Sequence, residues 1–134
     1  MRVFLDENMP RPLRHALAGH EVSYVEKEGW KGKENGELLA LVEGRFDVIL
    51  TSDGNIAYQQ TLAGRALSMI VVPTNNLTHL RANGVAILQT LDEIAALDHR
   101  VIVTLDWRGR RSLRRLDAAG ATAVELGPVR PFRG

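Results

Sequence analysis

The chain has 134 residues, of which 45% are hydrophobic and 25% charged, a composition typical of one ordinary globular domain. It contains no cysteine, which excludes disulfide bonds, thiolate chemistry and cysteine-ligated zinc. The first residues hold an apolar run of only three before an acidic pair, so no signal peptide is predicted. No stretch approaches the roughly 20 apolar residues of a membrane span. We therefore expect a cytoplasmic protein with no membrane partner.

The net charge of +1 is unevenly distributed along the chain. Residues 1–106 carry ten Lys and Arg against fourteen Asp and Glu, whereas residues 107–134 carry seven Arg against two acids. A basic C-terminal extension suggests a polyanionic partner, although charge alone favours a solvated, arginine-rich last helix. We expect one domain over residues 1–134, with its core at 1–106 and the extension at 107–134.

Short runs rich in β-branched residues alternate with helical stretches along the chain. Asn8 is predicted to cap the first helix, which holds Pro10 in its first turn and presents Leu13 and Leu17 on one face. The predicted strands are residues 2–5, 22–25, 46–51, 69–72, 101–105 and 122–126. The later predicted helices are residues 35–43, 56–64, 77–97 with a break at Asn83 and Gly84, and 112–119, and residues 26–33 are a predicted polar loop.

Strands separated by helices imply right-handed crossovers and a mostly parallel sheet. The near-continuous apolar run at residues 46–51 predicts a strand that is buried on both faces. The sequence therefore predicts an α/β fold with a mostly parallel sheet of five or six strands.

Acidic residues stand where two of the predicted strands end, Asp6 after the first and Asp53 after the third. In open α/β sheets, sites form at the carboxyl ends of strands beside the topological switch point, which a 2-1-3-4-5 order places between these two strands. We therefore expect Asp6 and Asp53 to lie side by side. Neighbouring carboxylates repel each other unless a cation or a proton intervenes. The oxygen and amide groups on offer favour Mg²⁺ or Mn²⁺ over zinc.

A third metal ligand is expected from the helix at residues 35–43. Glu34, Glu37 and Glu43 are candidates, and Glu37 is favoured because it sits in the first helical turn, near the rim of the sheet. Asn55 is a candidate for an amide ligand or for holding a metal-bound water. Each residue also has a purely structural explanation, such as a turn at Asp53, and the expected pairing of Asp6 with Asp53 is what favours function.

Histidine and tryptophan give weaker signals. His15, His20, His79 and His99 are scattered without paired spacing, so no histidine metal site is predicted. Trp30 and Trp107 fall in predicted loops, where packing at the edge of the core is favoured over stacking on a nucleobase.

The motifs LDENMP, GELLALV and VILTSDGN together resemble the PIN-like domains of small bacterial ribonucleases, which are related to the toxin half of toxin–antitoxin pairs. The resemblance implies a Rossmann-like three-layer sandwich and a Mg²⁺- or Mn²⁺-dependent hydrolase of RNA phosphodiester bonds. It also implies a small antitoxin partner and a homodimer. The acidic residues of the family would map onto Asp6, Glu37 and Asp53, with Asn55 beside them.

The chain departs from this family pattern at two positions. Asn55 stands where a second acid often follows the third strand, and Asn35 stands where an Asp often begins the second helix. Both changes remove charge and so weaken metal binding. A catalytically weakened domain that binds RNA or a partner protein therefore remains an open alternative.

A polyanionic substrate needs basic residues beside an acidic site. We expect Arg11, with Arg14, to contact phosphate, because both lie on the helix that leaves Asp6. The resemblance favours single-stranded RNA as the substrate. The arginines of the extension are more distant candidates: Arg108, Arg110, Arg111, Arg114 and Arg115.

A phosphoacceptor receiver domain is the rival from another class, since it too places an acidic pair after the first strand and an Asp after the third. Thr74 would suit its hydroxyl position. That family grips the phosphoryl group with a Lys after the fifth strand, whereas the lysines here are Lys27, Lys31 and Lys33, all far upstream. The nuclease is therefore the favoured prediction.

Overall fold

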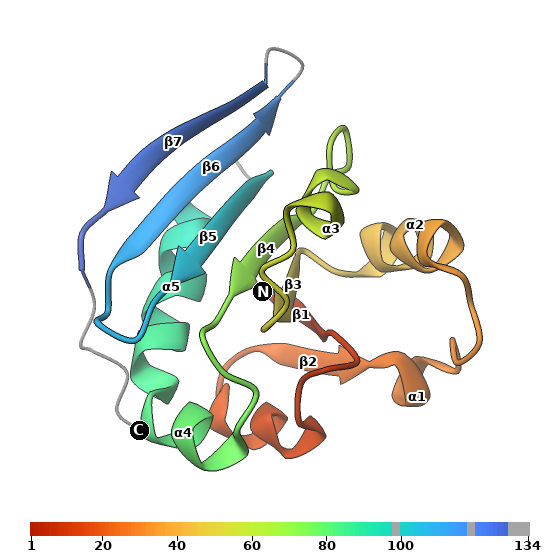
Figure 1. Cartoon of the computed structure of the whole chain (residues 1–134). Coiled ribbons are helices and arrows are strands. Elements are labelled where there is room, and N and C mark those ends of the chain that lie inside the picture. The colour runs from red at the N-terminus through yellow and green to blue at the C-terminus, as the bar shows by residue number, and fades with distance from the viewer. Residues whose placement is uncertain (98–99, 118–119, 129–134) are drawn as a thin grey trace.

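The computed structural model describes residues 1–97, 100–117 and 120–128. A single seven-stranded sheet runs through these residues in the order β2-β1-β3-β4-β5-β6-β7 (Figure 1). The first five strands in this order are parallel, and β6 and β7 join them antiparallel as a hairpin. The strands are β1 Arg2–Leu5, β2 Glu21–Tyr24, β3 Val48–Thr51, β4 Ser68–Val71, β5 Val101–Leu105, β6 Arg111–Asp117 and β7 Gly120–Leu126.

Helices cover both faces of the sheet, as predicted for an α/β fold. Consecutive strand residues point to opposite faces, so Val3 and Leu5 join one hydrophobic cluster with η1, α4 and α5, while Phe4 joins a second cluster with α2. The helices are the 3₁₀ helix η1 Arg11–Ala16, α1 Val25–Glu28, α2 Asn35–Arg45, α3 Ile56–Gln60, α4 Leu77–Ala82 and α5 Gly84–Ala96. Within the described ranges, none of these helices is long and apolar enough to span a membrane.

The parallel part of the sheet follows the sequence prediction closely. The predicted break at Asn83 is confirmed, because α4 ends at Ala82 and α5 begins at Gly84. The predicted polar loop at residues 26–33 instead begins with the short helix α1, and α2 continues past Gly44 to Arg45. These differences shift element ends by a few residues and leave the order of strands unchanged.

The predicted helix at residues 112–119 is wrong, and the sheet therefore has seven strands where five or six were predicted. Residues 111–117 form β6, while residues 118 and 119 lie outside the described ranges. Arg111 and Leu113 are buried whereas Ser112 between them is exposed, which is the two-residue period of a strand. The hairpin turn before β6 uses Gly109 at φ 77°, and the Asp106 carboxylate accepts hydrogen bonds from two backbone N–H groups of this turn.

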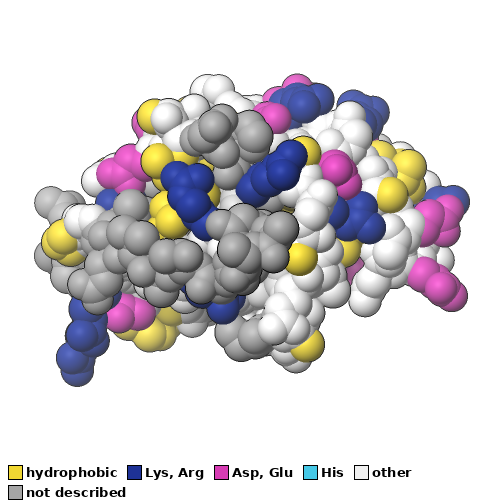
Figure 2. All heavy atoms as spheres, turned by 90° about the horizontal axis from the view of Figure 1, so that it is seen from above, with side chains coloured by type: hydrophobic (Ala, Val, Ile, Leu, Met, Phe, Trp, Pro, Cys, Tyr) yellow, Lys and Arg dark blue, Asp and Glu magenta, His cyan; other side chains and the backbone are white. Residues whose placement is uncertain are grey.

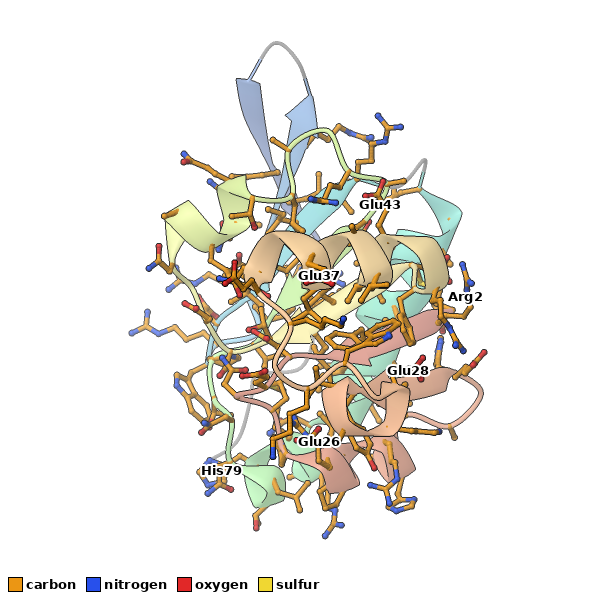
Figure 3. All side chains as sticks on the ribbon, turned by 90° about the vertical axis from the view of Figure 1, so that its right-hand side faces the viewer. Arg2, Glu26, Glu28, Glu37, Glu43 and His79 are labelled. Atoms are coloured by element: carbon orange, nitrogen blue, oxygen red, sulfur yellow. The ribbon has the colours of Figure 1, made fainter. Side chains whose placement is uncertain are left out.

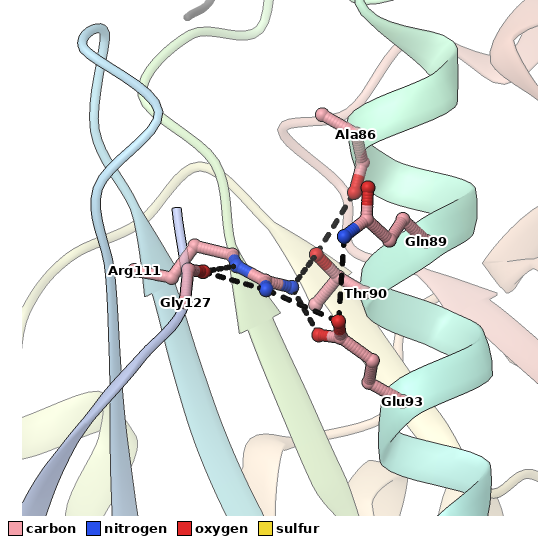
Figure 4. Close-up of polar contacts among 6 residues, drawn as sticks. All are labelled: Ala86, Gln89, Thr90, Glu93, Arg111 and Gly127. Carbon is pink, nitrogen blue, oxygen red and sulfur yellow. Dashed lines mark hydrogen bonds and ion pairs between the residues drawn. The ribbon is translucent and has the colours of Figure 1, made fainter. Parts of the chain in front are cut away.

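One arginine fastens the hairpin to α5 (Figure 4). The buried Arg111 guanidinium donates to the Gly127 carbonyl at 2.7 and 2.9 Å and to Thr90 Oγ1 at 3.2 Å. It also forms a close ion pair with Glu93, and Thr90 Oγ1 donates a hydrogen bond to the Ala86 carbonyl at 2.8 Å. Arg111 of the basic extension thus links β6 to the chain after β7 and to α5.

Replacing Glu93 with Gln tests this tie by its pH dependence. The Arg111 hydrogen bonds to Glu93 hold the pKa of that carboxyl below its ordinary value. A lowered folded pKa stabilises the fold above the unfolded pKa, and this stability is lost as the pH falls through the folded pKa. We expect E93Q to be less stable than wild type by about 1 kcal/mol near neutral pH, since Glu93 is 38% exposed and solvent screens the pair.

Thermal unfolding of both proteins from neutral to acidic pH measures this difference. The gap in Tm should close as the pH falls, whereas the exposed control Glu21→Gln should show a small gap at every pH. A gap for E93Q that persists unchanged at low pH would contradict the role given to the ion pair.

Candidate functional site

The candidate site lies where β1 and β3 end side by side, at the switch point of the sheet. Leu5 pairs with Leu50, and the Asp6 N–H then donates to the Leu50 carbonyl at 3.0 Å. This register places Asp6 beside Thr51, so the adjacency of the two strand ends predicted from the sequence is observed.

The hydroxyl of Thr51 is the centre of the polar contacts here. Thr51 is fully buried, and its Oγ1 donates to Asp6 Oδ2 at 2.7 Å. The same oxygen accepts from the Asp53 backbone N–H at 3.0 Å and from Asn8 Nδ2 at 3.3 Å. A hydroxyl offers one donor and two acceptor positions, so these three contacts use it fully. One side chain thereby orients Asp6, Asn8 and the backbone at Asp53.

Asn8 belongs to this site and does not cap a helix, which corrects the sequence prediction. The first helix is a 3₁₀ helix with Pro10 at its N-cap and no side-chain capping bond. The Asn8 side chain reaches across to β3 instead, where Oδ1 accepts from the Ser52 N–H at 3.4 Å and Nδ2 donates to Thr51. Its amide is therefore held beside the two strand ends.

Asp53 and Asn55 form two linked turns before α3. Asp53 Oδ1 accepts from the Asn55 N–H at 2.9 Å, and Asn55 Oδ1 accepts from the Ala57 N–H at 2.8 Å. Asn55 is therefore the N-cap of α3. Asp53 therefore forms the turn that was one of its two possible roles from the sequence, and its backbone N–H also donates to the Thr51 hydroxyl.

A pocket of about 90 Å³ opens next to Asp6. Tyr58 of α3 lines it, and burial is the main cause that raises the pKa of its hydroxyl well above the ordinary value. The negative charge of Asp6, a hydrogen bond to that carboxylate and the charge of Asp53 raise the Tyr58 pKa further. Tyr58 is therefore a neutral donor beside the carboxylates. The lining residues are Asp6, Glu7, Lys33, Asn35, Leu38, Leu39, Tyr58 and Thr61.

The glutamates proposed as a third ligand lie on or beside α2 (Figure 3). Glu37 forms an ion pair with Lys33 at 3.1 Å and is not among the residues that line the pocket. Glu43 binds Arg65 at 3.0 Å and accepts the Ala66 N–H, and Glu34 is the N-cap residue of α2 without a side-chain capping bond. The structure thus joins the Asp6 carboxylate and the Asp53 backbone through the Thr51 hydroxyl, and it gives Glu37 a different partner.

Arg11 and Arg14, predicted to contact phosphate, are bound to the chain itself. Arg11 donates to both carboxylate oxygens of Glu26 at 2.9 and 3.2 Å and to the carbonyls of Asp6 and Met9 at 3.1 and 2.8 Å. Arg14 donates to the Arg11 carbonyl at 3.0 Å. Because Arg11 donates to the carbonyls of Asp6 and Met9, it fixes the backbone of the loop that follows β1 and contains Asp6.

The arginines of the extension that the structure describes, on β6 and in the turn before it, lie away from Asp6. Ser112 pairs with Thr104, Thr104 with Val71 and Val71 with Thr51, so β6 is three strand spacings, about 14 Å, from β3. Arg110 pairs with Asp106 at 3.1 Å, and Arg111 is internal. On the described surface of the face in Figure 2, Lys and Arg are interspersed with Asp and Glu.

Trp30 packs at the edge of the core as expected, whereas Trp107 is 41% exposed. Trp30 contacts Phe4 and Phe46 at ring distances of 6.0 and 6.1 Å, and Trp107 contacts His79 edge-on at 5.7 Å. Among the other histidines, His20 accepts from the N-terminal amine at 3.0 Å, and His99 lies outside the described residues.

The chemistry of the site suits a hard divalent cation. Its donors are the carboxylates of Asp6 and Asp53, with the Asn8 amide and Glu7 nearby, and all are oxygen or amide groups. No cluster of three His, Cys, Asp or Glu that could enclose a metal occurs among the described residues. Mg²⁺ commonly binds through one or two carboxylates and completes its shell with water and substrate phosphate, so two carboxylates fit it.

Comparison with known proteins identifies a family for the first four strands of the sheet. A family model described as a PIN like domain matches residues 1–72, which is more than half of the chain and includes Asp6, Thr51 and Asp53. No curated protein and no solved structure matches the chain significantly.

Thr51 was not singled out from the sequence as a site residue, and a substitution tests its role. Thr51→Val keeps the shape but leaves the Asp53 N–H without its acceptor and removes the donor to Asp6 Oδ2. We expect a loss of about 1–3 kcal/mol in the free energy of unfolding. Thr51→Ser keeps the hydroxyl and is the matched control. Chemical denaturation in EDTA measures both, and equal stability of T51V and wild type would contradict the role of the hydroxyl.

Asp53→Asn tests repulsion between the two carboxylates. Asn forms the same turn to the Asn55 N–H and removes one negative charge, so without metal its stability should equal or exceed that of wild type. Asp53→Ala removes the turn as well and should be less stable. A large drop in Tm for D53N in EDTA would show that the charge itself is structural.

Proposed function

The chain belongs to the PIN-like domain family, a family of nuclease type, and from this premise we propose that it is a Mg²⁺- or Mn²⁺-dependent ribonuclease that hydrolyses RNA phosphodiester bonds. The observation that carries the proposal is the shared contact of Asp6 and the Asp53 backbone with the Thr51 hydroxyl at the switch point. Structural hydrogen bonding alone does not require two carboxylates at adjacent strand ends.

Asp6 and Asp53 are the proposed metal ligands. Each carboxylate oxygen has two lone pairs, so the contacts of Asp6 with Thr51 and the Glu7 N–H leave further acceptor positions. A bound divalent cation would polarise a phosphate oxygen and lower the pKa of an attacking water. The protein holds the two carboxylates in place through β1, β3 and Thr51, so little reorganisation accompanies binding.

Neighbouring residues have narrower proposed roles. Tyr58 stays protonated beside Asp6 and can donate a hydrogen bond to the carboxylate or to substrate. The Oδ1 atom of Asn55 accepts from the Ala57 N–H at the start of α3, so Asn55 would orient a water through its Nδ2 group. Glu37 acts as a third ligand only if it exchanges Lys33 for the cation.

The proposed substrate is single-stranded RNA, because a site at two strand ends admits one backbone. Arg11 contributes by holding the Asp6 loop, and phosphate contact by Arg11 would require it to leave Glu26. A toxin-like role, with a small antitoxin protein as partner and a homodimer as the assembly, is part of the same proposal.

The second candidate is a weakened PIN-like domain that binds RNA or a partner protein without cleaving. Asn55 caps a helix and Glu37 pairs with Lys33, so the carboxylates of Asp6 and Asp53 are the metal ligands that remain among the described residues. A larger set of acidic ligands would hold the metal more tightly. Metal affinity and RNA cleavage separate the two candidates.

Titration calorimetry with Mn²⁺ tests the metal site. Wild type should bind one ion with modest affinity, and Asp6→Asn with Asp53→Asn should abolish the binding. The matched control Glu21→Gln removes an exposed acid at the opposite end of the parallel strands and should bind as wild type. Unchanged Mn²⁺ binding in the double variant would place the ion elsewhere.

Cleavage of a labelled single-stranded RNA tests the reaction. Wild type with Mn²⁺ should cleave, and EDTA or Asp6→Ala should each lower the rate at least 100-fold, since removing a metal ligand removes the cation's contribution. Glu37→Gln should lower the rate less if its partner stays Lys33. Metal binding without cleavage of any RNA would favour the second candidate.

A further inference from the structure

The pocket beside Asp6 is lined by apolar and aromatic side chains that have no role in the proposed metal site. We propose that it binds one unpaired nucleobase of an RNA strand, adjacent to the phosphate that is cleaved. The proposal rests on the ribonuclease function for its biological role. Binding of the base itself depends only on the pocket and requires neither metal nor cleavage.

The pocket offers surfaces that suit the faces of a base. Leu38 and Leu39 of α2 and Tyr58 of α3 line the pocket, and all three belong to or pack against the same hydrophobic cluster. Its volume of about 90 Å³ is small, so the pocket would receive part of a single base and no more. Apolar and aromatic side chains that flank a cleft bind unpaired bases by stacking, with little dependence on sequence.

The charges of the pocket exclude phosphate as its occupant. Asp6 and Glu7 contribute two carboxylates, and Lys33, the cation among the described lining residues, is already paired with Glu37 at 3.1 Å. An anion would therefore meet net repulsion. A neutral base meets none, and its amino group can donate to a carboxylate.

The polar groups at the rim predict which bases bind best. Glu7 is exposed beside the pocket, and the Asn35 amide can both donate and accept. Adenine, cytosine and guanine carry an exocyclic amino group with two N–H donors, one for the Glu7 carboxylate and one for the Asn35 side-chain oxygen, whereas uracil offers only the single N–H of its ring. The geometry therefore favours bases with an amino group over uracil.

The position of the pocket explains why such a base would matter for cleavage. Asp6 lines the pocket and also contacts the Thr51 hydroxyl, so a base bound here sets its own nucleotide directly beside the proposed metal ligands. Anchoring that nucleotide would hold the neighbouring phosphate in position for attack.

The test is an amide NMR titration of the full chain in EDTA with AMP, CMP, GMP, UMP and ribose 5-phosphate. Concentrations reach the millimolar range, because stacking of a single base supports only weak binding. AMP, CMP and GMP should shift the amide signals of Leu38, Leu39, Tyr58 and Thr61, UMP should do so at least threefold more weakly, and ribose 5-phosphate should leave them unchanged.

Two variants check the location. Thr61→Gln places a longer side chain without an aromatic face at the exposed rim and should weaken nucleotide binding, and Asn35→Ala should weaken it less. Ala40→Gln, also exposed on α2 but outside the lining, is the control and should bind as wild type. Signal dispersion in each spectrum confirms folding before binding is compared.

The outcomes separate this inference from the proposed function. Pocket shifts from ribose 5-phosphate equal to those from AMP would overturn it in favour of a phosphate site. Metal-dependent RNA cleavage without any pocket shift would overturn it and leave the ribonuclease intact. Base binding without cleavage would support it and count against the ribonuclease. Equal affinity for UMP would overturn the amino-group selection.

Discussion

The buried hydroxyl of Thr51 is the constraint on which the site depends. A fully buried hydroxyl needs partners, and this one finds Asp6, Asn8 and the backbone of Asp53. Its position depends in turn on the parallel register of β1 and β3, which the Asp6 N–H extends by one hydrogen bond to the Leu50 carbonyl. A shift of this register would separate the two carboxylates and remove the site.

The surrounding structure serves to keep these strand ends rigid. Arg11 closes the loop after β1 through the carbonyls of Asp6 and Met9, and the cap at Asn55 starts α3 directly after Asp53. Tyr58 then stands on α3 facing Asp6, so the same short helix supplies one wall of the pocket. Functional groups on loops are precise when the elements that carry them are fixed in this way.

The sequence allowed the parallel sheet and the adjacency of the strand ends before Asp6 and Asp53 to be predicted, because strand periodicity and the switch-point rule act on local patterns. Thr51 and Asn8 could not be assigned, since their roles arise from contacts between residues 43 apart in the chain. One signal for Thr51 was available, a single polar residue ending an otherwise apolar buried strand. The ion pair of Arg11 could not be predicted because its partner Glu26 lies on another element, and β6 was missed because its arginine-rich sequence hides a two-residue period.

Anomalous diffraction from crystals of the protein soaked in Mn²⁺ tests the central claim most directly. A metal held by the two strand ends should give an anomalous peak within coordinating distance of the Asp6 and Asp53 carboxylates, with Thr51 still bonded to Asp6. A peak only at other carboxylates, such as Glu26 or Glu43, or no peak under saturating Mn²⁺, would contradict the account.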